Sequence, residues 1–232
     1  MKKALIIGST VVDVIVNLVD SLPTTGEDVH VRSQHMSLGG CAYNVSDSVR
    51  HFQVPYILFS PVGTGVYGYF VREELKKKGI SSPIPSPDMD NGCCYCFVEK
   101  SGERTFISYH GAEYLFQKDW FNLIDTEEID YICGLEIEET TGSNVVEFLE
   151  KNPELTVFFA PGPRLTVIDP ALVNRIYNLS PILHLNETEA LEVSQKSSVS
   201  EAGAYLYSKT HNTVIITLGE KGCYYFDGTT EE

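Results

Sequence analysis

Two glycines followed by an asparagine, Gly39, Gly40 and Asn44, form the pattern in this sequence that points most directly to ligand binding. A glycine pair ahead of a predicted helix exposes backbone N–H groups and lets a ligand approach the main chain. An asparagine one turn into that helix offers both a donor and an acceptor, which suits a vicinal diol. The other interpretation is a glycine turn that feeds a helix and leaves Asn44 merely exposed. The pattern indicates a site for a polar, hydroxylated ligand.

Glu136 lies where a ligand of an open α/β sheet would be bound, and Asp13 is a second acidic residue to consider. Asp13 is in a β-rich run at 11–19, and Glu136 closes the predicted strand 131–137. Ligands of open α/β sheets bind at the carboxyl ends of the strands. Asp13 taken alone also fits a surface acid on an edge strand.

Polar residues follow two further predicted strands. Asn186 and Glu189 come directly after strand 182–185, with the spacing of a helix capping box, and a carboxylate at a helix start also suits a metal ion. Thr217, Gly219 and Gly222 follow strand 214–218. Taken alone, these residues fit a β-turn into a strand at 222–226.

A second glycine motif, Gly63 to Gly68, has the G-x-G-x-x-G spacing of dinucleotide-binding loops, and Asp88 stands where an acid for the ribose is sought. That fingerprint usually occupies the first strand–helix turn, and Asp88 lies in a loop rich in proline and serine. An NAD or FAD enzyme is therefore the weaker hypothesis. The sequence lacks the P-loop pattern, the H-x-x-x-H zinc motif and the G-x-S-x-G elbow.

The composition bounds the class of protein. The chain has 232 residues, 43% of them hydrophobic and 21% charged, which is typical of a folded globular protein. A net charge of −15 argues against a nucleic-acid partner or an anionic membrane surface, and Arg164 and Lys221 are isolated candidates for binding an anion. We expect no transmembrane helix, because no apolar run approaches about 18 residues. Three of the six cysteines, Cys93, Cys94 and Cys96, share one predicted strand. Alternation puts Cys94 and Cys96 on one face and Cys93 on the other, which favours buried free thiols in the cytoplasm over a zinc site.

Strand-like and helix-like runs alternate along most of the chain. The predicted strands are 4–7, 11–19, 29–32, 56–62, 93–99, 104–109, 131–137, 155–160, 182–185 and 214–218. The predicted helices are 43–52, 68–78, 143–151, 170–178, 187–194 and 199–209. Strands separated by helices predict an α/β fold with a parallel sheet covered on both faces. The segments 12–37 and 89–110 carry strands without helices and are predicted to form a β lid on a core of 1–11, 38–88 and 111–232.

The order of these motifs resembles the PfkB family, the ribokinase-like carbohydrate and nucleoside kinases. The family pattern is matched by Gly39, Gly40, Asn44, Ser46 and Gly63, with Asp13, Glu136, Asn186 to Glu189 and the Gly219 loop following in order. The chain departs from the pattern at Gln53, Gly65 and Cys41, and the last of these replaces a lysine of ribokinases.

The resemblance implies a ribokinase-like three-layer sandwich with a mostly parallel sheet and ATP-dependent phosphorylation of a sugar or a related small hydroxylated compound. It assigns the acceptor to Asp13, Gly39, Gly40, Asn44 and Glu136. It assigns the nucleotide to Asn186, Thr217, Gly219 and Gly222, and Mg²⁺ to Glu189. It also implies a homodimer formed through the lid. The family's second signature, Gly-Ala-Gly-Asp, is absent from the sequence, so we expect the catalytic base beyond Glu232 and a truncated chain.

Two alternatives stay open. A nucleoside kinase of the same family would stack the base on an aromatic residue such as Phe97 or Tyr109. A non-catalytic sugar-binding or regulatory relative would bind sugar without ATP. The identity of the sugar is not encoded in any single residue.

Overall fold

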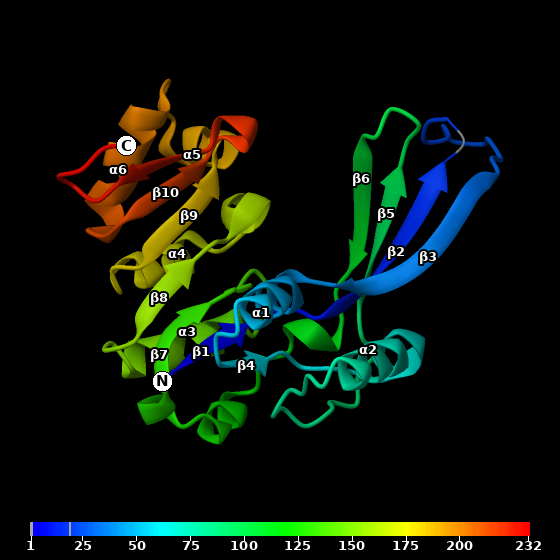
Figure 1. The fold of residues 1–232 in the computed structure, drawn as a ribbon, viewed down its shortest axis with the longest axis horizontal. Helices are drawn as coiled ribbons and strands as arrows, with labels where there is room; N and C mark the ends of the chain where they lie inside the picture. Colours follow the sequence, from blue (N-terminus) through cyan, green and yellow to red (C-terminus); the bar gives the residue numbers. More distant parts are fainter. Residues whose placement is uncertain (1, 19) are drawn as a thin grey trace. The chain divides into compact units, whose positions relative to one another are not determined.

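The computed structural model describes residues 2–18 and 20–232, and within these residues the strands form two separate sheets (Figure 1). Met1, the first residue of the predicted core, and Val19, the predicted end of the second strand, lie outside the described residues. The strands are β1 (Lys3–Ile7), β2 (Val11–Leu18), β3 (Val31–Gly39), β4 (Tyr56–Phe59), β5 (Cys93–Val98), β6 (Arg104–Tyr109), β7 (Ile129–Cys133), β8 (Thr156–Phe159), β9 (Ile182–Asn186), β10 (Val214–Thr217) and β11 (Cys223–Phe226).

The helices connect these strands, and several begin at a residue whose side chain accepts a hydrogen bond from a backbone N–H group of the first turn. Asp169 caps α4 in this way, and Ser198 caps α6. The α-helices are α1 (Cys41–His51), α2 (Gly65–Lys77), α3 (Gly142–Lys151), α4 (Pro170–Tyr177), α5 (Glu187–Ser194) and α6 (Val199–Thr210). Short 3₁₀ helices are η1 (Ala112–Tyr114), η2 (Lys118–Leu123), η3 (Thr126–Glu128), η4 (Gly162–Thr166) and η5 (Gly219–Lys221).

The large sheet has the strand order β11-β10-β9-β8-β7-β1-β4. Pairing is parallel from β1 through β7, β8 and β9 to β10, and β11 returns antiparallel beside β10. Its strands supply fully buried side chains such as Ile132, Phe159 and Leu183. The predicted α/β fold with a mostly parallel sheet is confirmed.

The small sheet has the order β3-β2-β5-β6, and its four strands lie side by side in Figure 1. Paired residues of neighbouring strands project to the same face of a sheet, and successive residues alternate between faces. Val12, Val14 and Val16 of β2 are buried on the face that contacts α2. On that face the hydroxyl of Tyr67 on α2 lies 2.8 Å from that of Tyr95 on β5. Asp13 therefore projects to the opposite face.

The chain divides into two compact units. The first comprises Met1–Ile7, Val45–Ile57 and Phe116–Glu232, and the second comprises Gly8–Asn44 and Leu58–Leu115. The boundary passes through α1 and β4, so the second unit contains the small sheet together with α2. The lid and core boundaries predicted from the sequence stay a prediction.

Two buried polar side chains tie together the chain segments that enter and leave the small sheet. Asn91 accepts a hydrogen bond from the Gly63 N–H at 3.0 Å and donates to the carbonyl of Thr10 at 3.1 Å. Glu113 is fully buried and accepts hydrogen bonds from the N–H groups of Gly92 at 2.6 Å and Gly111 at 2.9 Å. These contacts hold the start of β2 and both ends of the β5–β6 hairpin.

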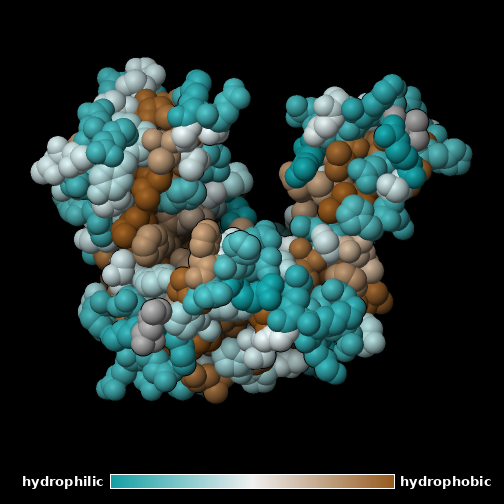
Figure 2. Space-filling view, viewed as in Figure 1, coloured by the Kyte–Doolittle hydropathy of each residue, from teal (hydrophilic) through white to brown (hydrophobic). Residues whose placement is uncertain are grey.

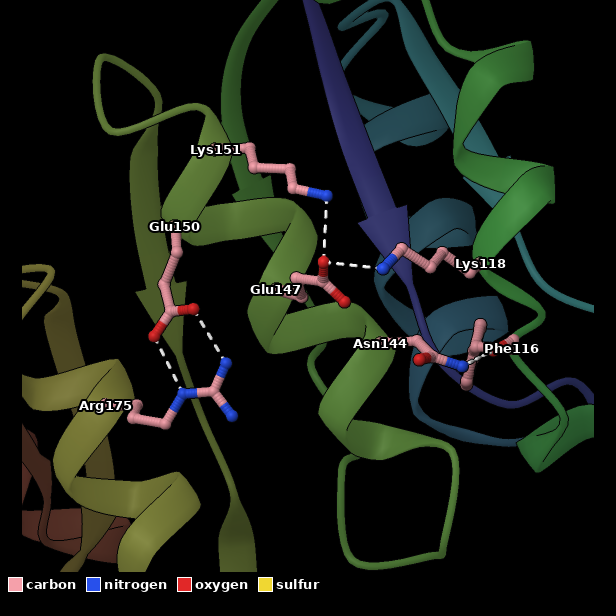
Figure 3. A network of polar contacts seen from close by, with 7 residues as sticks. All are labelled: Phe116, Lys118, Asn144, Glu147, Glu150, Lys151 and Arg175. Atoms are coloured by element: carbon pink, nitrogen blue, oxygen red, sulfur yellow. Dashed lines mark hydrogen bonds and ion pairs between the residues drawn. The ribbon is translucent and has the colours of Figure 1, made fainter.

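Ion pairs fasten the surface of α3 (Figure 3). The Glu147 carboxylate lies 2.7 Å from the Lys118 ammonium and 2.8 Å from that of Lys151, and these two partners lower its pKa to about 2. Glu150 pairs with Arg175 of α4 through two hydrogen bonds of 2.7 Å each. The pairs link α3 to its neighbours on both sides in the chain.

The structure corrects several predicted boundaries. The strand predicted at 29–32 is the longer β3, because its polar residues pair with β2 along almost its whole length while much of the strand is exposed. The strand predicted at 131–137 ends at Cys133, where the pairing with both β1 and β8 stops. The helix predicted from Gly68 begins at Gly65, since glycines in the first turn hid its start.

The six cysteines are free thiols, as predicted. The predicted burial is confirmed for only some of them. Cys93 and Cys96 are buried, whereas Cys223 is exposed.

Candidate functional site

The second unit carries a row of small polar side chains across the exposed face of the small sheet. Strand register aligns Ser37, Asp13, Cys94 and Ser108 on β3, β2, β5 and β6, and we call these four residues the polar row. Asp13 is half-buried, and this burial raises the pKa of its carboxyl group. Burial also raises the pKa of the Cys94 thiol, with a smaller opposite effect from its hydrogen bond to Ser108. The row can receive hydrogen bonds from the hydroxyl groups of a ligand.

Gly39 and Gly40 lead from the small sheet into α1, and each is glycine for a reason visible in the structure. A Cβ on Gly39 would overlap the Asp13 carboxylate. Gly40 has a φ of +94°, and a Cβ there would lie 2.5 Å from the carbonyl oxygen of Ser9. Asn44 follows in the first turn of α1, where it is exposed. The structure thus groups Asp13, Gly39, Gly40 and Asn44 within the second unit.

The expectation that the glycine pair exposes backbone N–H groups to a ligand was wrong for the first turn of α1. The N–H groups of Ala42 and Tyr43 donate to the Ser9 carbonyl at 3.1 and 3.3 Å, and that of Cys41 donates to the Ser9 hydroxyl at 3.3 Å. Ser9 itself is buried. Sequence reasoning missed this residue, because it lies 32 positions before the helix from whose first N–H groups it accepts hydrogen bonds. The polar groups left open to a ligand at this helix start are therefore side chains, and not the N–H groups of Cys41, Ala42 and Tyr43.

In the first unit, parallel pairing makes Asn186 and Thr217 neighbours. Asn186 ends β9, Thr217 ends β10, and the two are register partners. The Thr217 hydroxyl donates to the Leu185 carbonyl at 3.5 Å. Carboxyl ends of adjacent parallel strands are the usual position for ligand-binding groups.

The capping box at the start of α5 is confirmed. The Asn186 side chain accepts a hydrogen bond from the Glu189 N–H at 2.8 Å, and Glu189 Oε2 accepts one from the Asn186 N–H at 2.9 Å. Glu189 Oε1 lies 3.9 Å from the position that a Cβ on Gly162 would occupy.

The same carboxylate is compatible with Mg²⁺, which retains several waters and typically takes one or two carboxylates plus substrate phosphates. Within residues 2–18 and 20–232 there is no group of three or more His, Cys, Asp or Glu side chains arranged to hold a metal ion by themselves. Glu189 fits a water-rich magnesium site and not a protein cage.

Gly219 and Gly222 form the turn between β10 and β11. Both have positive φ values, +62° and +96°, and nothing lies within 4 Å of a Cβ built on either. The Leu218 N–H donates to the Gly222 carbonyl at 2.8 Å and closes the turn. The residues are therefore set by turn geometry, and the open space beside them leaves room for a ligand.

Glu136 lies beyond β7 and is almost completely buried, at 2% exposure. Its Oε1 is 3.6 Å from Arg164 Nη2, and Arg164 Nε is 2.9 Å from Glu138 Oε1. Arg164, a sequence-predicted candidate for binding an anion, instead pairs with acids that follow the neighbouring strand. The spacing of two alternate glutamates after β7 and an arginine after β8 is the signal that could have revealed this pairing.

The Gly63 to Gly68 motif has a structural explanation within the second unit. A Cβ on Gly63 would overlap the Met89 carbonyl, and a Cβ on Gly68 would overlap the Gly63 carbonyl. The Thr64 hydroxyl donates to Asp90 at 2.9 Å. These glycines allow close backbone packing, which removes the main support for a dinucleotide loop.

Solved structures with high structural similarity identify the fold. Ribokinase from Giardia lamblia superposes with a TM-score of 0.82 at 21% identity, covering 100% of this chain and 74% of that one. Ribokinase from Thermotoga maritima gives a TM-score of 0.79 at 20% identity, covering 100% of this chain and 77% of that one. The fold is that of the ribokinase-like α/β proteins.

Sequence comparison gives the family. The sequence model of the pfkB family carbohydrate kinases matches residues 1–232. The uncharacterized sugar kinase YegV of Escherichia coli K12 is 29% identical over 97% of this chain and 72% of its own length. Ribokinase of Mus musculus is 26% identical over 94% of this chain and 69% of its own length. The chain belongs to the pfkB family and is a kinase of the class that phosphorylates sugars and nucleosides.

One further observation concerns membranes. None of the helices among the described residues has the length and apolar character needed to cross a bilayer.

Proposed function

We propose that this protein transfers phosphate from ATP to a hydroxyl group of a sugar or a related small polyol. The observation that carries the proposal is the Asp13 carboxylate lying directly over Gly39, at the start of the helix that exposes Asn44. A carboxylate and an amide are suited to adjacent hydroxyl groups, and glycine leaves the space between them open. In this proposal Asp13, Gly39, Gly40 and Asn44 of the second unit bind the acceptor, whereas Glu136, 2% exposed and paired with Arg164 in the first unit, is not assigned to it.

The register of the small sheet favours a sugar over a nucleoside. Phe97 on β5 pairs with Val16 on β2, and Tyr109 on β6 pairs with Cys93, which in turn pairs with Val12. Both aromatic rings therefore project from the face opposite Asp13. The polar row that contains Asp13 has small side chains only. Phe106 is the aromatic residue on the Asp13 face, one row further along. If a base is bound at all, Phe106 replaces Phe97 and Tyr109 as the stacking candidate.

For the nucleotide side we propose that Asn186, Thr217, Gly219 and Gly222 contact ATP and that Glu189 holds Mg²⁺ through water. Bound Mg²⁺ would neutralise negative charge on the phosphate groups. The capping box orients the Glu189 carboxylate, and the register pairing holds the Thr217 hydroxyl beside Asn186.

We further propose a cytoplasmic homodimer that forms through the small sheet. Its outer strands expose apolar side chains: Val31 and Met36 on β3, and Phe106, Ile107 and Tyr109 on β6. Figure 2 shows hydrophobic residues among hydrophilic ones at the surface over these strands. Exposed apolar residues on sheet edges favour association with another chain. Sedimentation of the wild type and a Phe106→Lys variant tests this proposal, which predicts a dimer that the variant loses.

Isothermal titration calorimetry with a panel of pentoses, hexoses and nucleosides, each with and without ATP and Mg²⁺, tests the kinase proposal. We expect a sugar to bind and Asp13→Asn to weaken that binding while circular dichroism stays unchanged. Ser33→Ala, on β3 outside the polar row, is the matched control. Absence of sugar binding by the folded protein would overturn the proposal, and sugar binding that is indifferent to ATP would favour the non-catalytic alternative.

A further inference from the structure

A pocket of about 520 Å³ lies beside the C-terminal half of α2, entirely within the second unit. This volume falls in the range of small-molecule sites, about 300–1,000 Å³. Its apolar lining consists of side chains that are at most 8% exposed: Val62, Leu75, Ile80 and Ile84. None of the residues assigned above to the acceptor or to ATP lines this pocket.

The polar part of the pocket is cationic. Arg72 and Lys76 stand four residues apart and therefore on one face of α2, and both are exposed. The hydroxyl groups of Ser81, Ser82 and Ser86 complete the lining, which includes no acidic residue. The Arg72 guanidinium donates to the Gly63 carbonyl and to Ser86 Oγ at 3.4 Å, which fixes its position. In a chain of net charge −15 this pocket is a local exception.

The three consecutive lysines at the end of α2 differ in what they contact. Lys77 pairs with Glu74 at 2.5 Å, and Lys78 lies over the Tyr43 ring, 5.9 Å from its centroid. The Lys76 side chain forms no ion pair, hydrogen bond or ring contact with the described residues, and Lys76 is the one of the three that lines the pocket. Its ammonium group, like the Arg72 guanidinium, has no carboxylate partner within the described residues.

We propose that this pocket binds a small organic anion, a phosphate monoester or carboxylate attached to an aryl or branched alkyl group. The anionic group would lie between Arg72 and Lys76, with the Ser81 and Ser82 hydroxyls donating to it, since the Ser86 hydroxyl donates to the Val62 carbonyl at 2.7 Å. The apolar group would cover Leu75, Ile80 and Ile84. Arginine and lysine are the side chains that bind phosphate and carboxylate groups best. This site is additional to the kinase site and does not depend on it.

Phenyl phosphate is the probe, and calorimetric titration into the full chain is the measurement. Two control compounds each represent one part of the probe: inorganic phosphate has the anionic group, and benzyl alcohol has the aryl ring. We expect phenyl phosphate to bind at least about tenfold more tightly than either, because it uses both the cationic and the apolar lining. Saturating ATP and sugar should leave this binding in place, and displacement by ATP would overturn the proposal.

Two neighbouring variants separate a built site from general electrostatic attraction. Lys76→Gln and Lys77→Gln remove the same charge from the same helix turn, but only Lys76 lines the pocket. We expect Lys76→Gln to weaken phenyl phosphate binding about tenfold, the value of one charge-assisted contact, and Lys77→Gln to change it less than twofold. Equal losses in both variants, unchanged binding in Lys76→Gln, or no binding of phenyl phosphate by the wild type would each refute the site.

Discussion

Replacing Glu113 with glutamine tests how the small sheet is held at its base. Glutamine keeps the shape of the side chain but turns one accepting oxygen into an NH₂ group, which meets the N–H of either Gly92 or Gly111. A buried N–H that loses its acceptor costs about 1–3 kcal/mol, and removing the buried charge offsets part of that cost. We therefore expect Glu113→Gln to lower the free energy of unfolding by about 2 kcal/mol at pH 7.

The difference in the free energy of unfolding between the wild type and Glu113→Gln should change with pH in one direction. Burial is the largest effect on Glu113 and raises its pKa above the ordinary 4.5, although the two backbone hydrogen bonds act in the opposite direction. The folded protein then takes up the proton at a higher pH than the unfolded chain does. The wild type should gain stability over Glu113→Gln as the pH falls from 7 through the raised pKa toward 4.5.

Urea unfolding followed by circular dichroism gives the free energies, and amide hydrogen exchange at Gly92 and Gly111 reports the local effect. Glu103→Gln, the same substitution at an exposed position in the β5–β6 turn, is the control, and we expect a change within about 0.5 kcal/mol. If Glu113→Gln matches Glu103→Gln, or if its deficit shrinks as the pH falls, the buried carboxylate does not hold the hairpin as described.

Three further predictions follow from the sites. Asp13→Asn should weaken sugar binding about tenfold or more in calorimetry, and wild-type binding should decline on acidification at a pH above the ordinary value for aspartate, because burial raises the Asp13 pKa. Asn186→Ala and Ser198→Ala should each destabilise the protein by about 1 kcal/mol through a lost helix cap, but only Asn186→Ala should weaken ATP binding; equal nucleotide affinities would remove Asn186 from the site. In a carbon-detected NMR titration Glu147 should titrate near pH 2, and Lys118→Ala should move its pKa upward; an unmoved pKa would mean that this ion pair does not persist in solution.

The sequence predicted those parts of the fold that depend on local patterns. Alternating apolar strands and helices specified the parallel sheet, and the Asn186–Glu189 spacing specified a capping box that the structure contains. The residues that make up each of these signals are close together in the chain, so local sequence patterns are enough to find them.

Features that depend on distant partners were not predictable in the same way. β3 looked short because its polar residues gain strand conformation only by pairing with β2. The pairing of Arg164 with Glu136 and Glu138 requires knowing that β7 and β8 are adjacent. Ser9 accepts hydrogen bonds from the first N–H groups of α1, although it lies more than thirty positions before that helix in the sequence. No local pattern reveals such a contact.

The Asn91 side chain has a consequence for how the second unit opens. One amide group bridges the Gly63 N–H, the Thr10 carbonyl and, at 3.2 Å, the Gly92 carbonyl, so three segments far apart in the sequence share a single buried contact point. None of the three can fray while the others keep their full set of bonds. Local unfolding in this region is therefore cooperative, and its slowest-exchanging amides should lose protection together rather than strand by strand.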